Sequence, residues 1–263
     1  MMSGILSPAF LQAAGRADKG EQVGKITLFT QSADPTIASI SCTGEIQVTT
    51  IKNGAPLVET YSDLDGETLS IQADANTQIV ISGAEITACE IGQNTDYTNI
   101  SVKNTALTQL SCSDCYTLTA LDVSKNTALT QLDCSYCYAL TALDVSKNTA
   151  LTQLSCSYCH ALTALDVSKN TALTQLSCSD CHALTALDVS KNTALTQLSC
   201  SDCAKLISIS YPATNENVST AVAGAITNAD ATDGTVYTDS AGAYYSTIAD
   251  AATAKGWTIE QIA

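Results

Sequence analysis

A stretch of 22 residues is repeated in tandem through the middle of the chain, and it limits the possible folds more than any other feature. It reads TALTQLSCSDCYTLTALDVSKN from Thr105 and returns from Thr127, Thr149 and Thr171, with a truncated copy from Thr193. Each copy divides into two halves of 11 residues that share one spacing of leucines, a small apolar residue, and Cys or Asn. Because so short a unit cannot bury an apolar face alone, the copies must stack as coils of a solenoid.

Each half-repeat predicts one strand followed by one bend, since 11 residues cannot hold a strand, two turns and a regular helix. We therefore expect two parallel β-faces and no long helix between Ile86 and Pro212. The repeated asparagines should hydrogen-bond the backbone at their bend. The positions expected to face inward in one coil are Leu107, Leu110, Cys112, Cys115, Leu118, Leu121, Val123 and Asn126.

One half of the repeat matches a known pattern. LTALDVSKN, first found at Leu118 to Asn126, fits the frame LxxLxLxxN of leucine-rich repeats. The other half, LTQLSCSDC, resembles the nested bacterial variant of that family, in which both halves carry the leucine frame and Cys replaces the second apolar residue. The chain departs from the family where cysteines take the Asn position, at Cys115, Cys137, Cys159, Cys181 and Cys203.

The resemblance implies a mostly β leucine-rich-repeat solenoid with 22-residue coils, between an N-terminal β cap and a small C-terminal α/β cap. Before the repeat, segments such as TIASISC and EIQVTTI alternate in polarity and predict separate strands, and Asn53-Gly54 predicts a hairpin. After it, helical spacing in 217–228 and 244–255 alternates with short strands. The expected parts are an N-terminal arm (1–24), a β-rich cap (25–83), the solenoid (84–212) and an α/β cap (213–263).

Composition narrows the classes of partner. A formal net charge of −15, from 26 acids and 11 bases, argues against nucleic acid, which requires clustered Lys and Arg. The repeated lysines, from Lys103 to Lys191, are expected to be solvated and offset by neighbouring aspartates.

No apolar run is long enough for a membrane span. The first residues lack the basic start of a secretory signal and contain Pro8, so we expect synthesis in the cytosol without a signal peptide.

Ten of the 12 cysteines form CxxC pairs, a spacing that often indicates zinc. The repeat supplies another cause, because Val123 and Asn126 occupy the same two positions in the other half. We therefore expect buried, reduced thiols with raised pKa values, with disulfides and metal binding as the alternatives. No cofactor is expected.

No group of residues in the sequence indicates catalysis. His160 and His182 fall in the same phase of adjacent coils, without an orienting partner or a nucleophile. A phosphate loop, a nucleotide fingerprint and a zincin motif are all missing from the sequence. We expect a non-enzyme. An enzyme whose site lies in a cap is the least favoured of the three functional hypotheses.

The informative positions are those that vary while their surroundings repeat. One column reads Asp114, Tyr136, Tyr158, Asp180 and Asp202, and a second reads Tyr116, Tyr138, His160, His182 and Ala204. A third varies once, with Asp133 among serines. Tyr, Asp and His are common in recognition surfaces, so these columns predict a binding surface for a protein or a surface glycan. A flat ligand is expected to lie across rings ~5 Å apart. Neutral drift at exposed positions is the other interpretation.

The sequence also resembles surface and phage-associated proteins of Bacteroides-type gut bacteria. That resemblance implies a virion-associated protein, such as a head fibre or a tail accessory, held in a larger assembly through residues 1–24. The alternative is a bacterial cell-surface or secreted adhesin whose signal is missing or unrecognised.

Overall fold

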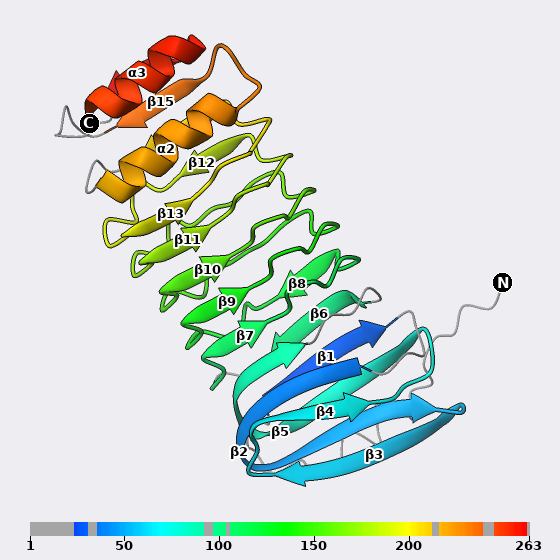
Figure 1. Ribbon diagram of the computed structural model, residues 1–263. Helices are drawn as coiled ribbons and strands as arrows, with labels where there is room; N and C mark the ends of the chain where they lie inside the picture. Colours follow the sequence, from blue (N-terminus) through cyan, green and yellow to red (C-terminus); the bar gives the residue numbers. More distant parts are fainter. Residues whose placement is uncertain are drawn as a thin grey trace.

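A computed structural model describes residues 24–30, 36–91, 97–103, 106–211, 216–238 and 245–261. The predicted N-terminal arm, apart from Gly24, lies outside the described residues. A β-rich unit stands at one end of the molecule, a stack of short parallel strands forms the middle, and two helices cover the other end (Figure 1).

The N-terminal unit is a mainly antiparallel sheet. In it β2 pairs with β3, β4 and β5, and β1 lies between β5 and β6. The two predicted strands TIASISC and EIQVTTI are one strand, which is a correction: the chain passes Gly44, at φ 83°, as an irregularity of register rather than a turn. Asn53 and Gly54, at φ 52° and 73°, form the predicted hairpin turn. The strands are β1 (Gly24–Thr30), β2 (Thr36–Lys52), β3 (Ala55–Ser62), β4 (Asp65–Ile71), β5 (Thr77–Ile91) and β6 (Tyr97–Lys103).

Strand β5 joins this unit to the solenoid. Its first part pairs antiparallel with β1 and β2, and its second part, around Cys89, pairs parallel with the first short strand of the repeats. Strand β6 likewise pairs parallel with β8 (Ala120–Asp122). The expected boundary between residues 83 and 84 therefore falls inside a strand, and one sheet continues across it.

The solenoid confirms the fold class. On its first face, strands of sequence QLS or QLD stack in parallel and in register, so that each Leu lies on the Leu 22 residues away. The expected absence of a long helix holds for the described residues between Ile86 and Tyr211. The first-face strands are β7 (Gln109–Ser111), β9 (Gln131–Asp133), β10 (Gln153–Ser155), β11 (Gln175–Ser177) and β13 (Gln197–Ser199).

The second face differs from the prediction, because its ladder is not continuous. Regular strands occur there only toward the two ends, as β8 (Ala120–Asp122) and β12 (Ala186–Asp188), and an isolated bridge joins Asp166 to Asp188. In the middle coils this side is held by side chains in the interior. Asn148 Nδ2 donates to the carbonyls of Val123 (3.0 Å) and Asn126 (2.8 Å), and the pattern repeats at Asn170 and Asn192.

The cysteines in the Asn position take over part of this role. Cys137 Sγ donates to the carbonyl of Cys112, 25 residues earlier, at 3.3 Å, which is the same offset as from Asn148 to Val123. The thiol makes this one bond where the amide makes two. All 12 cysteines are buried free thiols, and the predicted inward positions of the coil are buried as expected.

The C-terminal cap continues the second face. Strands β12, β14, β15 and β16 are parallel, and two helices replace the first-face strands of the last two coils (Figure 1). Cys200 Sγ donates to the carbonyl of Ala221 in the first of these helices (3.6 Å), which therefore packs at the end of the first-face sheet and protects its open edge. The elements are β14 (Ser208–Tyr211), α2 (Glu216–Asn228), β15 (Thr235–Thr238), α3 (Tyr245–Lys255) and β16 (Thr258–Gln261). Neither helix of the described residues has the length and apolar character to span a membrane.

Candidate functional site

The two variable columns occupy the bend that follows each first-face strand. We call Asp114, Tyr136, Tyr158, Asp180 and Asp202 the first column, and Tyr116, Tyr138, His160, His182 and Ala204 the second column. The backbone of the first column is tied to the neighbouring coil, since Asp114 N–H donates to the Ser135 carbonyl (2.9 Å) and Tyr136 N–H to that of Ser157 (2.8 Å). These bonds continue the pairing of the coils beyond the strands.

Every residue of the first column has a left-handed backbone, with φ between 58° and 61°. Asp tolerates this region better than most residues, whereas a bulky side chain there is rare, and the region costs an ordinary L-residue roughly 1–2 kcal/mol. Asp114, Asp180 and Asp202 therefore suit the bend. Tyr136 and Tyr158 occupy it against the preference of the backbone.

Six side chains of the two columns stack as rings, and we call them the ring array. In the second column, Tyr116, Tyr138, His160 and His182 form one continuous stack, with centroids 5.0, 4.8 and 4.5 Å apart and planes within 9° of parallel. In the first column, Tyr136 stacks on Tyr158 at 4.5 Å. Edge contacts of 6.3 and 6.2 Å join the columns.

This stacking corrects the expected mode of binding. The ring spacing agrees with the prediction, but neighbouring rings cover one another's faces, so no flat ligand can lie across the faces inside a stack. The reason is that the separation of coils is close to the stacking distance of aromatic rings. Solvent reaches the ring edges instead, and Tyr136 and Tyr138 remain 37% and 38% exposed.

Carboxylates of the first column face polar atoms of the second column in the same coil. Tyr116 OH donates to Asp114 Oδ1 at 3.1 Å, and this hydrogen bond raises the pKa of Tyr116. His182 Nε2 lies 3.7 Å from Asp180 Oδ1. The negative charge of Asp180 also raises the pKa of Tyr158. Asp114 and Asp180 thus each interact with the second-column side chain of their own coil.

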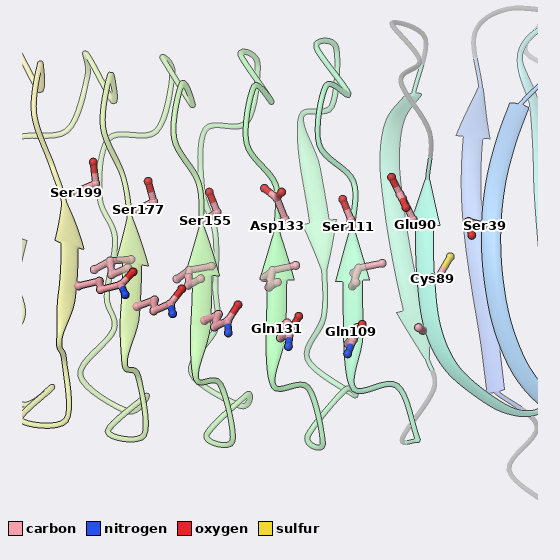
Figure 2. Close-up of a pocket in the computed structure, with 18 of the residues that line it drawn as sticks. Ser39, Cys89, Glu90, Gln109, Ser111, Gln131, Asp133, Ser155, Ser177 and Ser199 are labelled. Carbon is pink, nitrogen blue, oxygen red and sulfur yellow. The ribbon is translucent and has the colours of Figure 1, made fainter. Parts of the chain in front are cut away.

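The structure shows a second feature that the sequence reasoning missed. A groove with a volume of about 790 Å³ runs along the first face, at right angles to the strands, between a row of glutamines and a row of serines interrupted by Asp133 (Figure 2). The sequence contains the pattern, since a polar residue flanks the central Leu of every first-face strand on both sides. It was overlooked because it is almost the same in every copy of the repeat. The rows are Gln109, Gln131, Gln153, Gln175 and Gln197, and Ser111, Asp133, Ser155, Ser177 and Ser199.

The two rows differ in their free hydrogen-bonding capacity. Ser155 Oγ lies 2.6 Å from Ser135 Oγ in the neighbouring coil, and Ser177 and Ser199 make equivalent contacts. Asp133 Oδ1 accepts the Ser135 N–H at 2.9 Å. Within the described part of the chain, the side-chain amides of these glutamines make no hydrogen bond and remain available to a ligand.

The opposite bend carries the lysine column. Lys125, Lys147, Lys169 and Lys191 are exposed there, and the side chain of Lys103 lies outside the described residues. The aspartates were expected to offset the charges of these lysines, but this effect is small at Asp144. Hydrogen bonds from Ser146 are the main cause that lowers the pKa of Asp144, and the charge of Lys147 contributes less. The bend with the ring array contains one lysine, Lys205.

The expected raised pKa is found for several thiols but not for Cys181, whose pKa is lowered by its hydrogen bond with Cys156. Burial raises the pKa of Cys89 to about 12 and that of Cys203 to about 12, so both are protonated at neutral pH. Among the described residues, no group of three or more His, Cys, Asp or Glu side chains could hold a metal ion.

Comparison with known proteins finds similarity among solved structures. No protein-family model matches the chain, and no curated protein matches it. The functional domain of InlJ from Listeria monocytogenes, which is described as including a cysteine ladder, is a similar solved structure, with 30% identity and a TM-score of 0.36. The match covers 60% of this chain and 35% of the InlJ chain, so this chain spans about a third of the length of the InlJ chain.

Proposed function

We propose that this protein is a non-enzymatic recognition module that binds a protein partner through the ring array and the adjoining groove. One observation carries the proposal. Tyr136 and Tyr158 stand at left-handed positions where three other coils have Asp, and their rings are stacked and partly solvent-accessible.

Neutral drift explains this pattern poorly. Drift at an exposed bend should accumulate residues that the backbone tolerates, and Asp is such a residue here. The tyrosines instead oppose the backbone preference, and they form a second stack that contacts Tyr138 and His160. Stacking stabilises the pair, but it holds apolar ring edges and phenol groups toward solvent, which is typical of recognition surfaces.

A cell-binding assay tests the proposal. Fluorescently labelled protein is incubated with intact Bacteroides-type cells, and the double variant Tyr136→Asp/Tyr158→Asp is compared with wild type. Because Asp is native to this position in other coils, the variant should fold and yet bind at least about tenfold more weakly. A matched control, Lys147→Gln/Lys169→Gln in the opposite bend, should bind as wild type does. Equal binding by the array variant and wild type would contradict the role of the array.

The same assay identifies the class of partner. Treatment of the cells with protease should abolish binding, whereas periodate oxidation of their glycans should not. The reverse result would show a surface glycan as the partner. A variant of the groove, Gln153→Ala/Gln175→Ala, reports separately on the free amides, and a loss of binding of about tenfold or less is expected from it.

The finer proposal is that the module is displayed on a phage particle. Its support is the resemblance described above and the polar, Gly-containing segment within residues 1–24 that separates a short apolar stretch from the first strand. Deletion of residues 1–24 should leave the solenoid folded and the purified particles without the protein, as judged by mass spectrometry. Normal incorporation of the truncated chain would argue against docking through this arm.

A bacterial surface or secreted adhesin is the alternative, and it shares the same recognition surface. The two are separated by fractionation of infected and uninfected cultures. Recovery of the protein only with capsid components supports the virion, and recovery with washed, uninfected cells supports the adhesin.

A further inference from the structure

The stack of the second column stops one coil before the solenoid does. His182 is its last ring, and the equivalent position of the next coil is Ala204. His160, which has a ring on each side, is half-buried, whereas the side chain of His182 is 49% exposed. One face of the His182 imidazole thus lacks the ring that covers its neighbours.

The fifth coil, which contains Ala204, also contains a carboxylate without a second-column partner. Asp114 accepts a hydrogen bond from the hydroxyl of Tyr116, and Asp180 lies near Nε2 of His182, each within one coil. In the fifth coil the corresponding pair is Asp202 and Ala204, and a methyl group offers the carboxylate no donor. Asp202 is exposed and makes no hydrogen bond or ion pair within the described residues.

We propose that this open position beyond His182 binds the guanidinium group of an arginine side chain from the protein partner. The planar group would lie on the free face of His182, in place of the missing fifth ring, and donate to the Asp202 carboxylate. The proposal rests on the recognition role given above and names the chemistry that the partner presents to the array.

Three properties favour arginine over other donors. Its guanidinium is planar and stacks on aromatic faces, which the ammonium of lysine cannot do. It offers donors in a fork that matches a carboxylate. Its positive charge suits a site flanked by Asp180 and Asp202 on a chain of net charge −15. Lys205 follows Ala204 and opposes a cation there, but it is exposed and has no partner within the described residues.

The protein contains only two histidines, and both are in the stack, so nuclear magnetic resonance can report on the site directly. The imidazole C–H signals are assigned with a His182→Asn variant. Acetyl-arginine amide is then titrated into the wild-type protein. We expect a saturable shift that is larger for His182 than for His160, with a dissociation constant in roughly the millimolar range for so small a probe. Nα-acetyl-lysine amide has the same charge, but its ammonium group is not planar. Nα-acetyl-citrulline amide has a planar side-chain group without a charge, so both compounds should bind more weakly.

Two variants test the geometry. Ala204→Tyr supplies the missing ring and should reduce the affinity for acetyl-arginine amide by about tenfold or more, and Asp202→Asn should reduce it by about tenfold. Glu45→Gln, which removes one negative charge in the N-terminal sheet, is the matched control and should bind like wild type. Because Ala204→Tyr extends an existing stack, its melting temperature should be at least that of wild type.

The inference is overturned if the three probes shift His182 alike, if no shift saturates, or if Ala204→Tyr binds acetyl-arginine amide as wild type does. The titration requires no natural partner, so its failure leaves the recognition role to the cell-binding assay. Conversely, loss of the recognition role in that assay would not change the outcome of the titration.

Discussion

The rings of Tyr136 and Tyr158 stack with centroids 4.5 Å apart, although both residues have a backbone φ of 61°. At these two positions ring stacking therefore stabilises the folded protein, whereas the left-handed backbone destabilises it. A change to Asp relieves the backbone and removes the ring, so each single variant should differ little from wild type in stability. The recognition surface is thus separable from the fold.

A double-mutant cycle measures the stacking term by itself. Tyr136→Asp, Tyr158→Asp and the double variant are compared by urea denaturation, so that the backbone contributions cancel. The coupling should have the size usual for aromatic pairs, about 0.5–1.5 kcal/mol. A coupling near zero would mean that the rings stack without stabilising one another.

The asparagine and cysteine columns should differ in their contribution to stability. Asn148→Ala removes two interior hydrogen bonds, although the Val123 and Asn126 carbonyls keep the backbone N–H bonds from Asn126 and Leu129, so it should destabilise by about 2–3 kcal/mol. Cys159→Ala removes one bond, to the Cys134 carbonyl (3.2 Å), and should cost about 1–2 kcal/mol. Urea denaturation checks both values. Equal losses would show that the thiol and the amide are equivalent at this bend.

The buried thiols should make the protein sensitive to alkaline pH. Cys203 has a pKa of about 12 when folded against an ordinary value of 9.0, so between these values the unfolded chain releases a proton that the folded chain keeps. Stability from this group is therefore complete below pH 9.0 and is lost as pH rises toward about 12, by up to roughly 1.4 kcal/mol per pH unit. Stability measured against pH should fall less steeply over this range in Cys203→Ala. Parallel curves for the two proteins would contradict the buried state of this thiol.

The cysteines should also be reduced and free of metal. Thiol titration in denaturant should find all 12, and elemental analysis should find no stoichiometric zinc. Cys156→Ala should cost about 1–2 kcal/mol, as expected for a small core truncation rather than the loss of a metal site. A deficit of free thiols would instead indicate disulfides between coils.

The C-terminal cap offers a fluorescent probe, because Trp257 is the only tryptophan. A Cβ added to Gly234 would collide with the Trp257 ring, whose Nε1 donates to the Ala231 carbonyl at 2.8 Å. Gly234→Ala should therefore displace the indole, shift its emission to longer wavelength and destabilise the cap. Unchanged emission would show that the backbone at Gly234 can move away without disturbing the ring.

The repeat by itself determined the coil, its inward columns and the hydrogen-bonding role of the asparagines. A strict period of 22 residues places each residue in the environment of its copy, so one coil predicts the others. Composition and spacing also predicted the two C-terminal helices, while the two strands expected on either side of Gly44 proved to be the single strand β2.

Tertiary structure decided the properties that depend on how the coils are spaced and joined. The left-handed backbone of Tyr136 and Tyr158, the mutual covering of the ring faces, and the open position beside His182 all follow from the stacking of one coil on the next. The groove arises in the same way, because it exists only where the polar rows of several strands lie side by side. A sequence pattern states which residues recur, but the distance between copies and the solvent left between them are set by the assembled backbone.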